Sequence, residues 1–388
     1  MSAVAPHGRV VLTADEAAVR AVMLARVRAI GCYPITPQTV IVERLAEQVA
    51  RRNDVEFANL ESEHAMFAWV IAAARVGVRT FTATSSQGLL YAHEQLHRAS
   101  RERIPLVAVN VNRALFAPWS IQPDLSDSMS QRDTGWVQLY CASAQEVLDT
   151  ILCAYRVAER AMLPVLVCLE GFLLSHTTEA VAVPEQEAVD AFLPPLAVPD
   201  DWLLDPTRAR AFSELPEPVD YAAFQRHVDE AMVVAGAALE DARTSFASCF
   251  GRARPGALVL DGDPEAERAL VTIGTIGETA LELLEDDGEP VRLVRVHAFR
   301  PFPAMALAEA LAGAHTVAVI DRAPAFGSMG PLGGEVRALG LDGAVTTFVG
   351  GLGGTEVTPA TLRWALDRAG RTDPREAVLG PIPIPEGV

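Results

Sequence analysis

The sequence predicts an α/β protein that contains two parallel-sheet units. Short apolar segments alternate with helix-like segments from about residue 14 to residue 177, and the same alternation returns over residues 269–350. This order is typical of parallel sheets that are covered by helices. Between the two units, residues 179–255 are rich in proline and acidic residues, which indicates a surface connector. We therefore expect one domain over residues 1–255, including the connector, and a second over residues 256–388.

Local patterns give the elements of the first unit. Residues 13–16 (Thr-Ala-Asp-Glu) form a helix-capping sequence, because the threonine and the glutamate can both satisfy free N–H groups at a helix start. Residues 105–111 are almost entirely apolar, as in a strand that is buried on both faces. The expected strands are residues 55–60, 79–84, 105–111 and 164–170. Three helices are expected over residues 37–52, 88–101 and 143–160, and two more are expected to begin at residues 14 and 63.

The second unit repeats the same pattern after the connector. The connector itself contains an amphipathic segment over residues 221–242, which predicts one helix. The expected strands of the second unit are residues 270–274, 291–296, 316–321 and 344–350, and the expected helices are residues 277–285 and 303–312 and the end of the glycine-rich segment 327–339. This order again predicts a parallel sheet.

The composition excludes several classes of protein. All 32 basic residues are arginine, so the chain cannot form the lysine Schiff base of pyridoxal phosphate enzymes or the lysine contact of a P-loop. The formal net charge of −18 opposes binding to nucleic acid, which needs cationic groups. The longest apolar run, residues 161–174, is interrupted and too short to cross a membrane.

The cysteines are scattered. None of the five, at positions 32, 141, 153, 168 and 249, has a partner at the spacing of an iron–sulfur or zinc motif. We therefore expect no metal site in this chain. An odd number of scattered cysteines also suits a reducing cytoplasm better than a disulfide framework.

Three polar motifs stand where strand-like runs end or helix-like runs begin. They are Tyr33–Pro37, Asn59–Phe67 and Thr82–Gly88. Such positions meet along one edge of an open α/β sheet, which is where ligands bind. Glu63 is the most informative residue among them, because an apolar helix follows it directly. A carboxylate surrounded by apolar side chains is costly unless it has a partner or holds a proton.

The other two motifs each allow two interpretations. Pro34 and Pro37 would make a rigid turn that presents the hydroxyl of Thr36 to a ligand, but Thr36 could equally cap the next helix, and the local sequence favours the cap. The segment Thr84–Gly88 could hold an anion on its backbone N–H groups, or it could be a tight loop with a helix cap. The local sequence does not decide between these two.

Arg113 follows the buried strand 105–111 and would stand at the same sheet edge. A guanidinium group there suits a substrate carboxylate, which it can bind through two parallel hydrogen bonds. The alternative is a structural ion pair with Asp124, Asp127 or Glu61, which the sequence alone slightly favours.

Taken together, the motifs resemble the α subunit of 2-oxoacid:ferredoxin oxidoreductases, and most closely the pyruvate type. The similarity extends over nearly the whole chain, and several separate motifs occur in one order, which makes it specific. The motifs are Tyr33–Pro37, Glu61–Glu63, Thr84–Gly88, Asp127–Trp136, Glu170–Phe172 and Ser175–Thr177.

This resemblance implies a fold and a mechanism. The first domain would be a pyrimidine-binding domain of the thiamine diphosphate enzymes, and the second a transketolase C-terminal-like domain. Glu63 would bind N1′ of the aminopyrimidine and so activate the thiazolium carbon for attack on a 2-oxoacid. Pro34 would also contact the cofactor, and Thr36 and Arg113 would bind the oxo and carboxylate groups of the substrate.

The resemblance also implies partner proteins. Thiamine enzymes bind Mg²⁺ and diphosphate through a Gly-Asp-Gly sequence with a later asparagine. Here Asp261-Gly262-Asp263 is a poor match, and no asparagine follows Asn112. A β subunit is therefore expected to bind Mg²⁺ and the diphosphate and, together with γ- and δ-type subunits, to carry the iron–sulfur clusters. Coenzyme A and ferredoxin are the expected co-substrates.

The identity of the 2-oxoacid is less constrained. Pyruvate is the preferred expectation, but Trp119 lies in a stretch that is usually rich in isoleucine and asparagine in pyruvate-type members. Branched-chain and aryl 2-oxoacids therefore stay open. Two rival functions are a non-oxidative thiamine-dependent decarboxylase or carboligase subunit and a non-catalytic assembly protein. The presence of Thr36, Glu63 and Arg113 together argues against the second rival.

Overall fold

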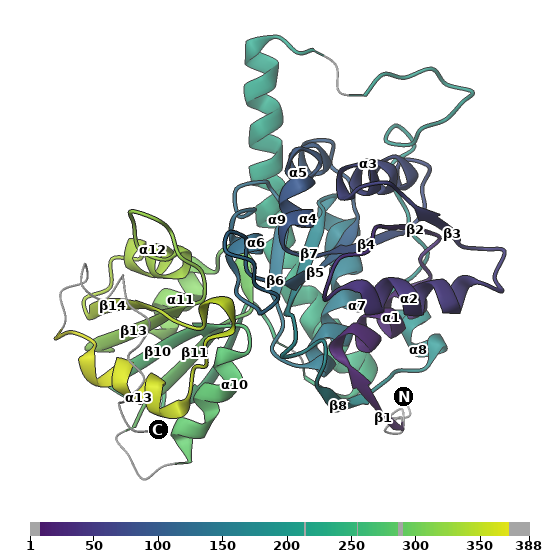
Figure 1. Cartoon of the computed structure of the whole chain (residues 1–388). Coiled ribbons are helices and arrows are strands. Elements are labelled where there is room, and N and C mark those ends of the chain that lie inside the picture. Colours follow the sequence, from purple (N-terminus) through teal and green to yellow (C-terminus); the bar gives the residue numbers. More distant parts are fainter. Residues whose placement is uncertain (1–7, 213–214, 254, 286–289, 372–388) are drawn as a thin grey trace.

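The computed structural model describes residues 8–212, 215–253, 255–285 and 290–371, which form two large sheets side by side (Figure 1) and one small two-stranded sheet. The first sheet has the strand order β12-β6-β7-β5-β4-β2-β3. Its strands are β2 (Ala29–Cys32), β3 (Glu56–Asn59), β4 (Thr80–Thr84), β5 (Val107–Asn112), β6 (Val137–Tyr140), β7 (Val165–Glu170) and β12 (Ala298–Arg300). All pair in parallel except β12, which lies antiparallel to β6.

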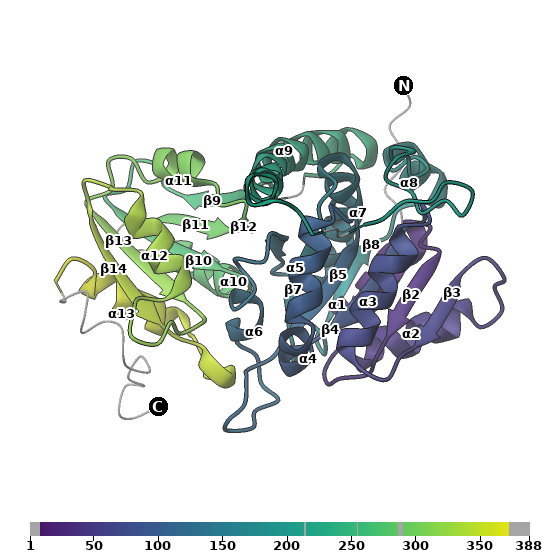
Figure 2. The same ribbon diagram turned by 90° about the horizontal axis from the view of Figure 1, so that it is seen from above.

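Helices cover both faces of this sheet (Figure 2). Alternate residues of β5 point to opposite faces, so Val107 and Val109 pack in one apolar core and Ala108 packs in the other. The first core includes residues of α1 (Ala14–Leu24), α2 (Thr39–Val49) and α7 (Ala144–Ala161), and the second includes residues of α3 (Glu63–Ala74), α4 (Ser86–Tyr91) and α5 (His93–Arg101). The parallel α/β class expected from the sequence is confirmed.

The second sheet has the order β14-β13-β10-β11-β9. Its strands are β9 (Leu258–Gly262), β10 (Arg268–Ile273), β11 (Arg292–Val296), β13 (Thr316–Asp321) and β14 (Ala344–Val349), and β9 runs antiparallel to β11. The short helices around it are α10 (Ile276–Leu281), η1 (Glu282–Leu284), α11 (Ala304–Ala310), α12 (Pro331–Ala338), η2 (Leu352–Gly354) and α13 (Pro359–Arg368). The four parallel strands are the four that the sequence predicts.

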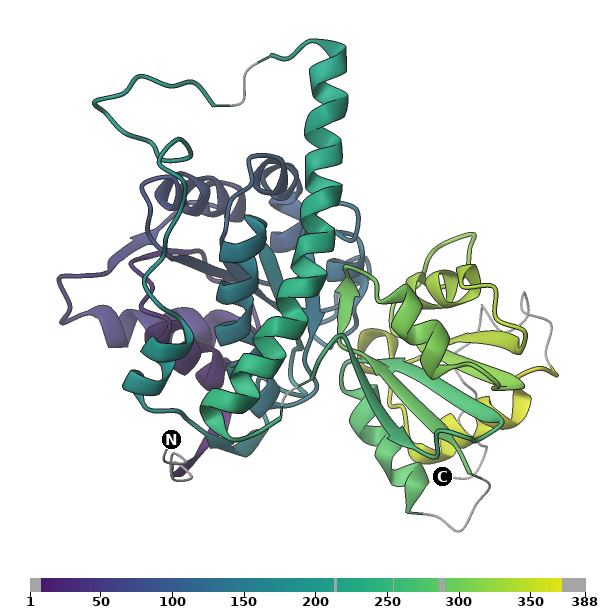
Figure 3. The same cartoon turned by 180° about the vertical axis from the view of Figure 1, so that it is seen from behind.

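The connector is more structured than expected. Strand β8 (Thr178–Ala182) pairs antiparallel with β1 (Arg9–Thr13), and α8 (Gln186–Phe192) follows. Helix α9 (Pro218–Phe250) is longer than predicted, because its last turns bury Phe246 and Phe250 against the first sheet's helices. Its amino-terminal turns extend beyond the rest of the molecule (Figure 3). Within the described ranges, no helix is both long and apolar enough to cross a membrane.

Other differences arise from tertiary contacts. The helix expected over residues 88–101 is two helices, α4 and α5, that meet at Ala92. Strands β6, β9 and β12 are not apparent from the sequence, since they are short or exposed and are defined by their partners. Strand β12 follows the second sheet's β11 in the chain but joins the first sheet, so the two units share hydrogen bonds. The domain boundary at residue 255 stays a prediction.

A buried ion pair joins the two sheets. Glu170 ends β7 and pairs with Arg322, which follows β13; their side chains are 1% and 5% exposed. Glu170 also accepts hydrogen bonds from the backbone N–H and the hydroxyl of Thr275, at 2.8 and 2.7 Å. Because all three residues follow or end parallel strands, the carboxyl ends of the two sheets meet here.

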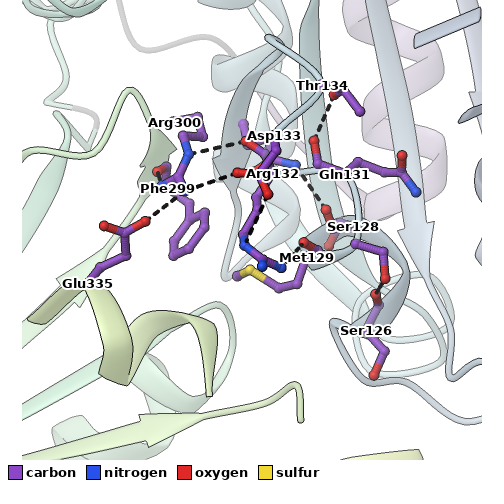
Figure 4. A network of polar contacts seen from close by, with 12 residues as sticks. Ser126, Ser128, Met129, Gln131, Arg132, Asp133, Thr134, Phe299, Arg300 and Glu335 are labelled. Carbon is purple, nitrogen blue, oxygen red and sulfur yellow. Dashed lines mark hydrogen bonds and ion pairs between the residues drawn. The ribbon is translucent and has the colours of Figure 1, made fainter. Parts of the chain in front are cut away.

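A second contact holds the segment after α6 (Ser126–Met129) against the second unit (Figure 4). Arg300 of β12 donates to the backbone carbonyl oxygen of Arg132 at 3.2 Å and pairs with Glu335 of α12 at 2.7 Å. The guanidinium of Arg300 also lies over the ring of Phe299. One arginine thus links three segments that are distant in the sequence.

The ion pair gives a prediction for stability. Glu170→Ala would leave Arg322 buried without its carboxylate, and we expect the free energy of unfolding to fall by about 3–5 kcal/mol. Urea denaturation measures the change. The control is Glu47→Ala, which removes an exposed pair with Arg44 and should cost less than about 1 kcal/mol. An equally small loss for Glu170→Ala would contradict this account.

Candidate active site

Glu63 is the first residue of α3, and it is only 6% exposed. The helix begins here because the hydroxyl of Ser62 accepts a hydrogen bond from the N–H of Ala65 at 3.2 Å. Burial raises the pKa of the Glu63 carboxyl, while its own backbone N–H and the charge of Arg113 act in the opposite direction. The side chain therefore holds or shares a proton more readily than an ordinary, solvent-exposed glutamate.

The carboxyl group of Glu63 lies directly against Gly88 of α4. A Cβ atom at Gly88 would stand 2.4 Å from Oε1 of Glu63 and 2.5 Å from Oγ1 of Thr84. A side chain at position 88 would displace the Glu63 carboxyl group or the Thr84 hydroxyl, so glycine is what lets both lie over the helix backbone in this arrangement. The glycine thereby places the acid beside the loop between β4 and α4.

This loop and the first turn of α4 contain polar atoms that no group in the described part of the chain satisfies. Thr84 Oγ1, Ser85 Oγ and Gln87 Nε2 are buried and have no hydrogen-bond partner among the described residues. Ser85 is the N-cap residue of α4, but its hydroxyl does not cap the helix. The capped-loop interpretation therefore does not account for these residues. Buried donors and acceptors without partners are costly, so such a cluster suits a ligand.

Arg113 reaches into the same site from the end of β5 and is 5% exposed. Its Nη1 atom donates to the backbone carbonyl oxygen of Thr36, and its Nη2 atom donates to Oε1 of Gln87, each at 2.6 Å. Both acceptors are neutral, so they hold the guanidinium without cancelling its charge. Burial lowers the pKa of Arg113, and the charges of Asp127 and Glu63 oppose that change.

The two ion-pair alternatives that involve aspartates are wrong. Asp127 accepts from the backbone N–H of Arg113, at 3.2 Å, and not from its guanidinium. Asp124 accepts from the backbone N–H groups of Ser126 and Gly353, at 2.9 and 3.2 Å.

The structure brings Thr36 and Arg113 together through the Thr36 carbonyl group. Thr36 itself is exposed, and α2 begins at Thr39 after the N-cap residue Gln38. The alternative in which Thr36 caps this helix is therefore wrong, and its hydroxyl is available for a ligand. Pro34 is also exposed, two residues before Thr36. The roles of these residues toward substrate and cofactor stay predictions.

The sequence analysis missed Asp127 as an organising residue. Its fully buried carboxyl group accepts five hydrogen bonds, which come from the backbone N–H groups of Ser86, Arg113 and Ser128 and from the side-chain amides of Asn110 and Asn112, over 2.7–3.2 Å. Burial raises its pKa to about 6, although the donors oppose this. The sequence contains a signal, since two asparagines end a buried strand and an aspartate follows 15 residues after Asn112.

Nothing in the described part of the chain forms a group of three or more metal-binding side chains. The sequence Asp261-Gly262-Asp263 lies at the exposed end of β9, on the edge of the second sheet. It is therefore not part of the site around Glu63, whose residues come from the first sheet.

These features define the class of protein. A buried acid at a helix start, a glycine beneath it and polar atoms nearby without partners among the described residues form a site for a polar ligand. Family comparison agrees: residues 20–244 match the thiamine-diphosphate-binding domain of pyruvate flavodoxin/ferredoxin oxidoreductases, and residues 266–362 match core domain II of pyruvate:ferredoxin oxidoreductase. The chain belongs to the pyruvate flavodoxin/ferredoxin oxidoreductase family.

Individual relatives are similar over most of their length. The pyruvate synthase subunit PorA of Methanothermobacter thermautotrophicus is 41% identical over 90% of this chain and 92% of its own. The ketoisovalerate oxidoreductase subunit VorA of Pyrococcus horikoshii is 39% identical over 90% of each chain.

Solved structures support the fold alone. A 2-oxoglutarate:ferredoxin oxidoreductase from Magnetococcus marinus has a TM-score of 0.71 at 19% identity, and the match covers 96% of this chain and 66% of that one. A split-gene transketolase gives a TM-score of 0.50 at 14% identity, over 95% of this chain and 96% of the other.

Asp127 gives a prediction for the site. In Asp127→Asn, an amide nitrogen would face N–H donors that now point at a carboxylate oxygen, so we expect a loss of about 2–3 kcal/mol in the free energy of unfolding. The position of Arg113 would also change, and turnover should fall. Denaturation and activity assays measure both effects. The control is Asp133→Asn, an exposed residue, which should change neither; an equally mild Asp127→Asn would argue against the organising role.

Proposed function

We propose that this chain is the α subunit of a thiamine-diphosphate-dependent 2-oxoacid:ferredoxin oxidoreductase. The reaction is the coenzyme A-dependent oxidative decarboxylation of a 2-oxoacid to an acyl-CoA and CO₂ with reduction of ferredoxin, or its reverse. The observation that carries the proposal is the buried Glu63 carboxyl above Gly88, close to an arginine whose side-chain hydrogen bonds go to the neutral oxygens of Thr36 and Gln87.

Glu63 would hold the aminopyrimidine end of the cofactor. Its raised pKa allows it to share a proton with the ring nitrogen N1′. When bound, thiamine diphosphate supplies the carbon nucleophile and takes up the electrons that decarboxylation releases. Thr84 contributes a hydroxyl group beside Glu63 and Ser85 a neighbouring one, and neither has a hydrogen-bond partner among the described residues; Pro34 would also contact the cofactor.

Arg113 and Thr36 would bind the substrate. The guanidinium group of Arg113 retains N–H groups beyond the two that bind Thr36 and Gln87, so it can accommodate a carboxylate. The exposed hydroxyl of Thr36 would then reach the oxo oxygen. These contacts orient the carbonyl carbon toward the cofactor and fix the carboxylate that leaves as CO₂.

The rest of the catalytic site would come from other subunits. A β subunit would bind Mg²⁺ and the diphosphate and carry an iron–sulfur cluster, and γ- and δ-type subunits would carry electrons to ferredoxin. This agrees with scattered cysteines, four of which are buried in this chain. We also propose a cytoplasmic location, which suits these free thiols.

Pyruvate is the proposed substrate, and a branched-chain 2-oxoacid is the second candidate. Relatives named for pyruvate and for ketoisovalerate are about equally similar to this chain. Trp119 favours the smaller substrate, because its ring stacks on Phe116 with a centroid distance of 5.3 Å and lies 5.9 Å from Cζ of Arg113. It would occupy space next to the bound carboxylate.

The central test is Glu63→Gln in the complex purified with its partner subunits. A glutamine cannot take the proton, so thiamine-dependent CO₂ release should fall by about 10²–10⁴-fold, while assembly and thermal stability are retained. Release of radiolabelled CO₂, the thiamine content and the iron–sulfur cluster content of the complex are measured together. Unchanged turnover would remove Glu63 from the mechanism. Aldehyde or ketol formation without an iron–sulfur partner would favour the non-oxidative rival.

Trp119 gives a test of substrate choice. Trp119→Ala would open space beside Arg113, and we expect kcat/KM for 3-methyl-2-oxobutanoate relative to pyruvate to rise about tenfold. Met305→Ala, which removes an exposed apolar side chain on α11, is the control and should leave the ratio unchanged. A constant ratio in Trp119→Ala would exclude this residue as a determinant of side-chain size.

A further inference from the structure

Gln87 lies in the first turn of α4, between Ser86 and the glycine beneath Glu63. Its Oε1 atom accepts a hydrogen bond from Nη2 of Arg113 at 2.6 Å and lies 2.7 Å from the hydroxyl oxygen of Ser86. Because an arginine can only donate, this contact fixes which end of the amide faces Arg113. The amide nitrogen of Gln87 therefore points away from the guanidinium.

That nitrogen is buried and has no acceptor among the residues that the structure describes. A buried N–H group without a partner is costly, so its presence here indicates an acceptor that arrives from outside the chain. The Nε atom of Arg113 is also buried and also lacks an acceptor among the described residues. Two unused donors thus belong to two residues that are hydrogen-bonded to each other.

The neutrality of Gln87 is the second observation. A glutamate would fit the same space and would bind Nη2 of Arg113 more strongly, as a charged pair. It would also neutralise the guanidinium and so compete with any anionic ligand. Gln87 instead holds Arg113 in place and leaves its positive charge available.

We propose that Gln87 is a further substrate-binding residue, whose carbonyl oxygen holds Arg113 and whose amide nitrogen donates to an oxygen of the 2-oxoacid. The inference rests on the proposed function, in which Arg113 takes the substrate carboxylate. Gln87 then supplies a second donor next to that carboxylate and sets how much charge Arg113 offers to it. Its effect belongs to substrate affinity and not to the proton held by Glu63.

The test compares Gln87→Glu with Gln87→Met in the assembled complex. Both side chains are close in size to glutamine. Glutamate keeps the contact with Arg113 but neutralises its charge, whereas methionine loses both hydrogen bonds and leaves the charge free. We expect KM for the 2-oxoacid to rise about 100-fold in Gln87→Glu and about 10-fold in Gln87→Met, with smaller changes in kcat. Calorimetric binding of oxamate, an unreactive analogue of pyruvate, should weaken in the same order.

A purely structural role for Gln87 predicts the opposite order, because the glutamate would anchor Arg113 at least as well as the native residue. Equal or better oxamate binding by Gln87→Glu would therefore overturn the inference. Gln48→Glu, which adds the same charge to an exposed position of α2, is the matched control and should not change KM. The activity of the native complex separates the two proposals. If the native complex oxidises the 2-oxoacid in a thiamine- and coenzyme A-dependent reaction while Gln87→Glu leaves KM unchanged, only the role of Gln87 fails; if the native complex shows no such reaction, the proposed function itself fails.

Discussion

The site depends first on the buried carboxyl group of Asp127. Its five donors come from the start of α4, from the end of β5 with the residue after it, and from α6, which are separate segments of the chain. A carboxylate this deep is costly unless its hydrogen bonds are formed, so the cost of burial forces these segments into one arrangement. The backbone N–H of Arg113 is one of the donors, and therefore the direction in which Arg113 leaves its strand follows from Asp127.

A second buried carboxylate sets the position of the other sheet. Glu170 binds Thr275 and Arg322, which follow strands β10 and β13. The carboxyl ends of both parallel sheets therefore face one another, and the segment after α6 is held between them (Figure 4). The loop that bears Trp119 is tied to the second unit, since the backbone N–H of Gly354 donates to the carbonyl oxygen of Pro123. The second unit thus shapes the substrate side of the site without supplying Glu63 or Arg113.

Sequence reasoning succeeded where the cause is local. Glu63 could be found because a serine cap and an apolar helix surround it, and the parallel strands could be found because they are continuous apolar runs. It failed where a feature depends on contacts between residues that are distant in the sequence. The donors to Asp127 lie between 1 and 41 residues away, and β12 has only three residues, whose partner strand lies about 160 positions earlier. The choice between a cap and a ligand role for Thr36 also required the observed start of α2.

The pattern of charge explains why this chain would work only with partners. Arg113 is fixed by neutral acceptors and Glu63 by burial, so neither group is neutralised by a close ion pair within the site. This arrangement lowers the stability of the isolated chain, because polar atoms of Thr84, Ser85 and Gln87 have no hydrogen-bond partner among the described residues. Binding of cofactor and substrate would supply the missing hydrogen bonds and so restore this stability. The gain would be largest when another subunit closes the site and excludes water, because each electrostatic contact is then stronger. The unsatisfied polar atoms of the separate subunit would therefore favour tight binding once the enzyme is assembled.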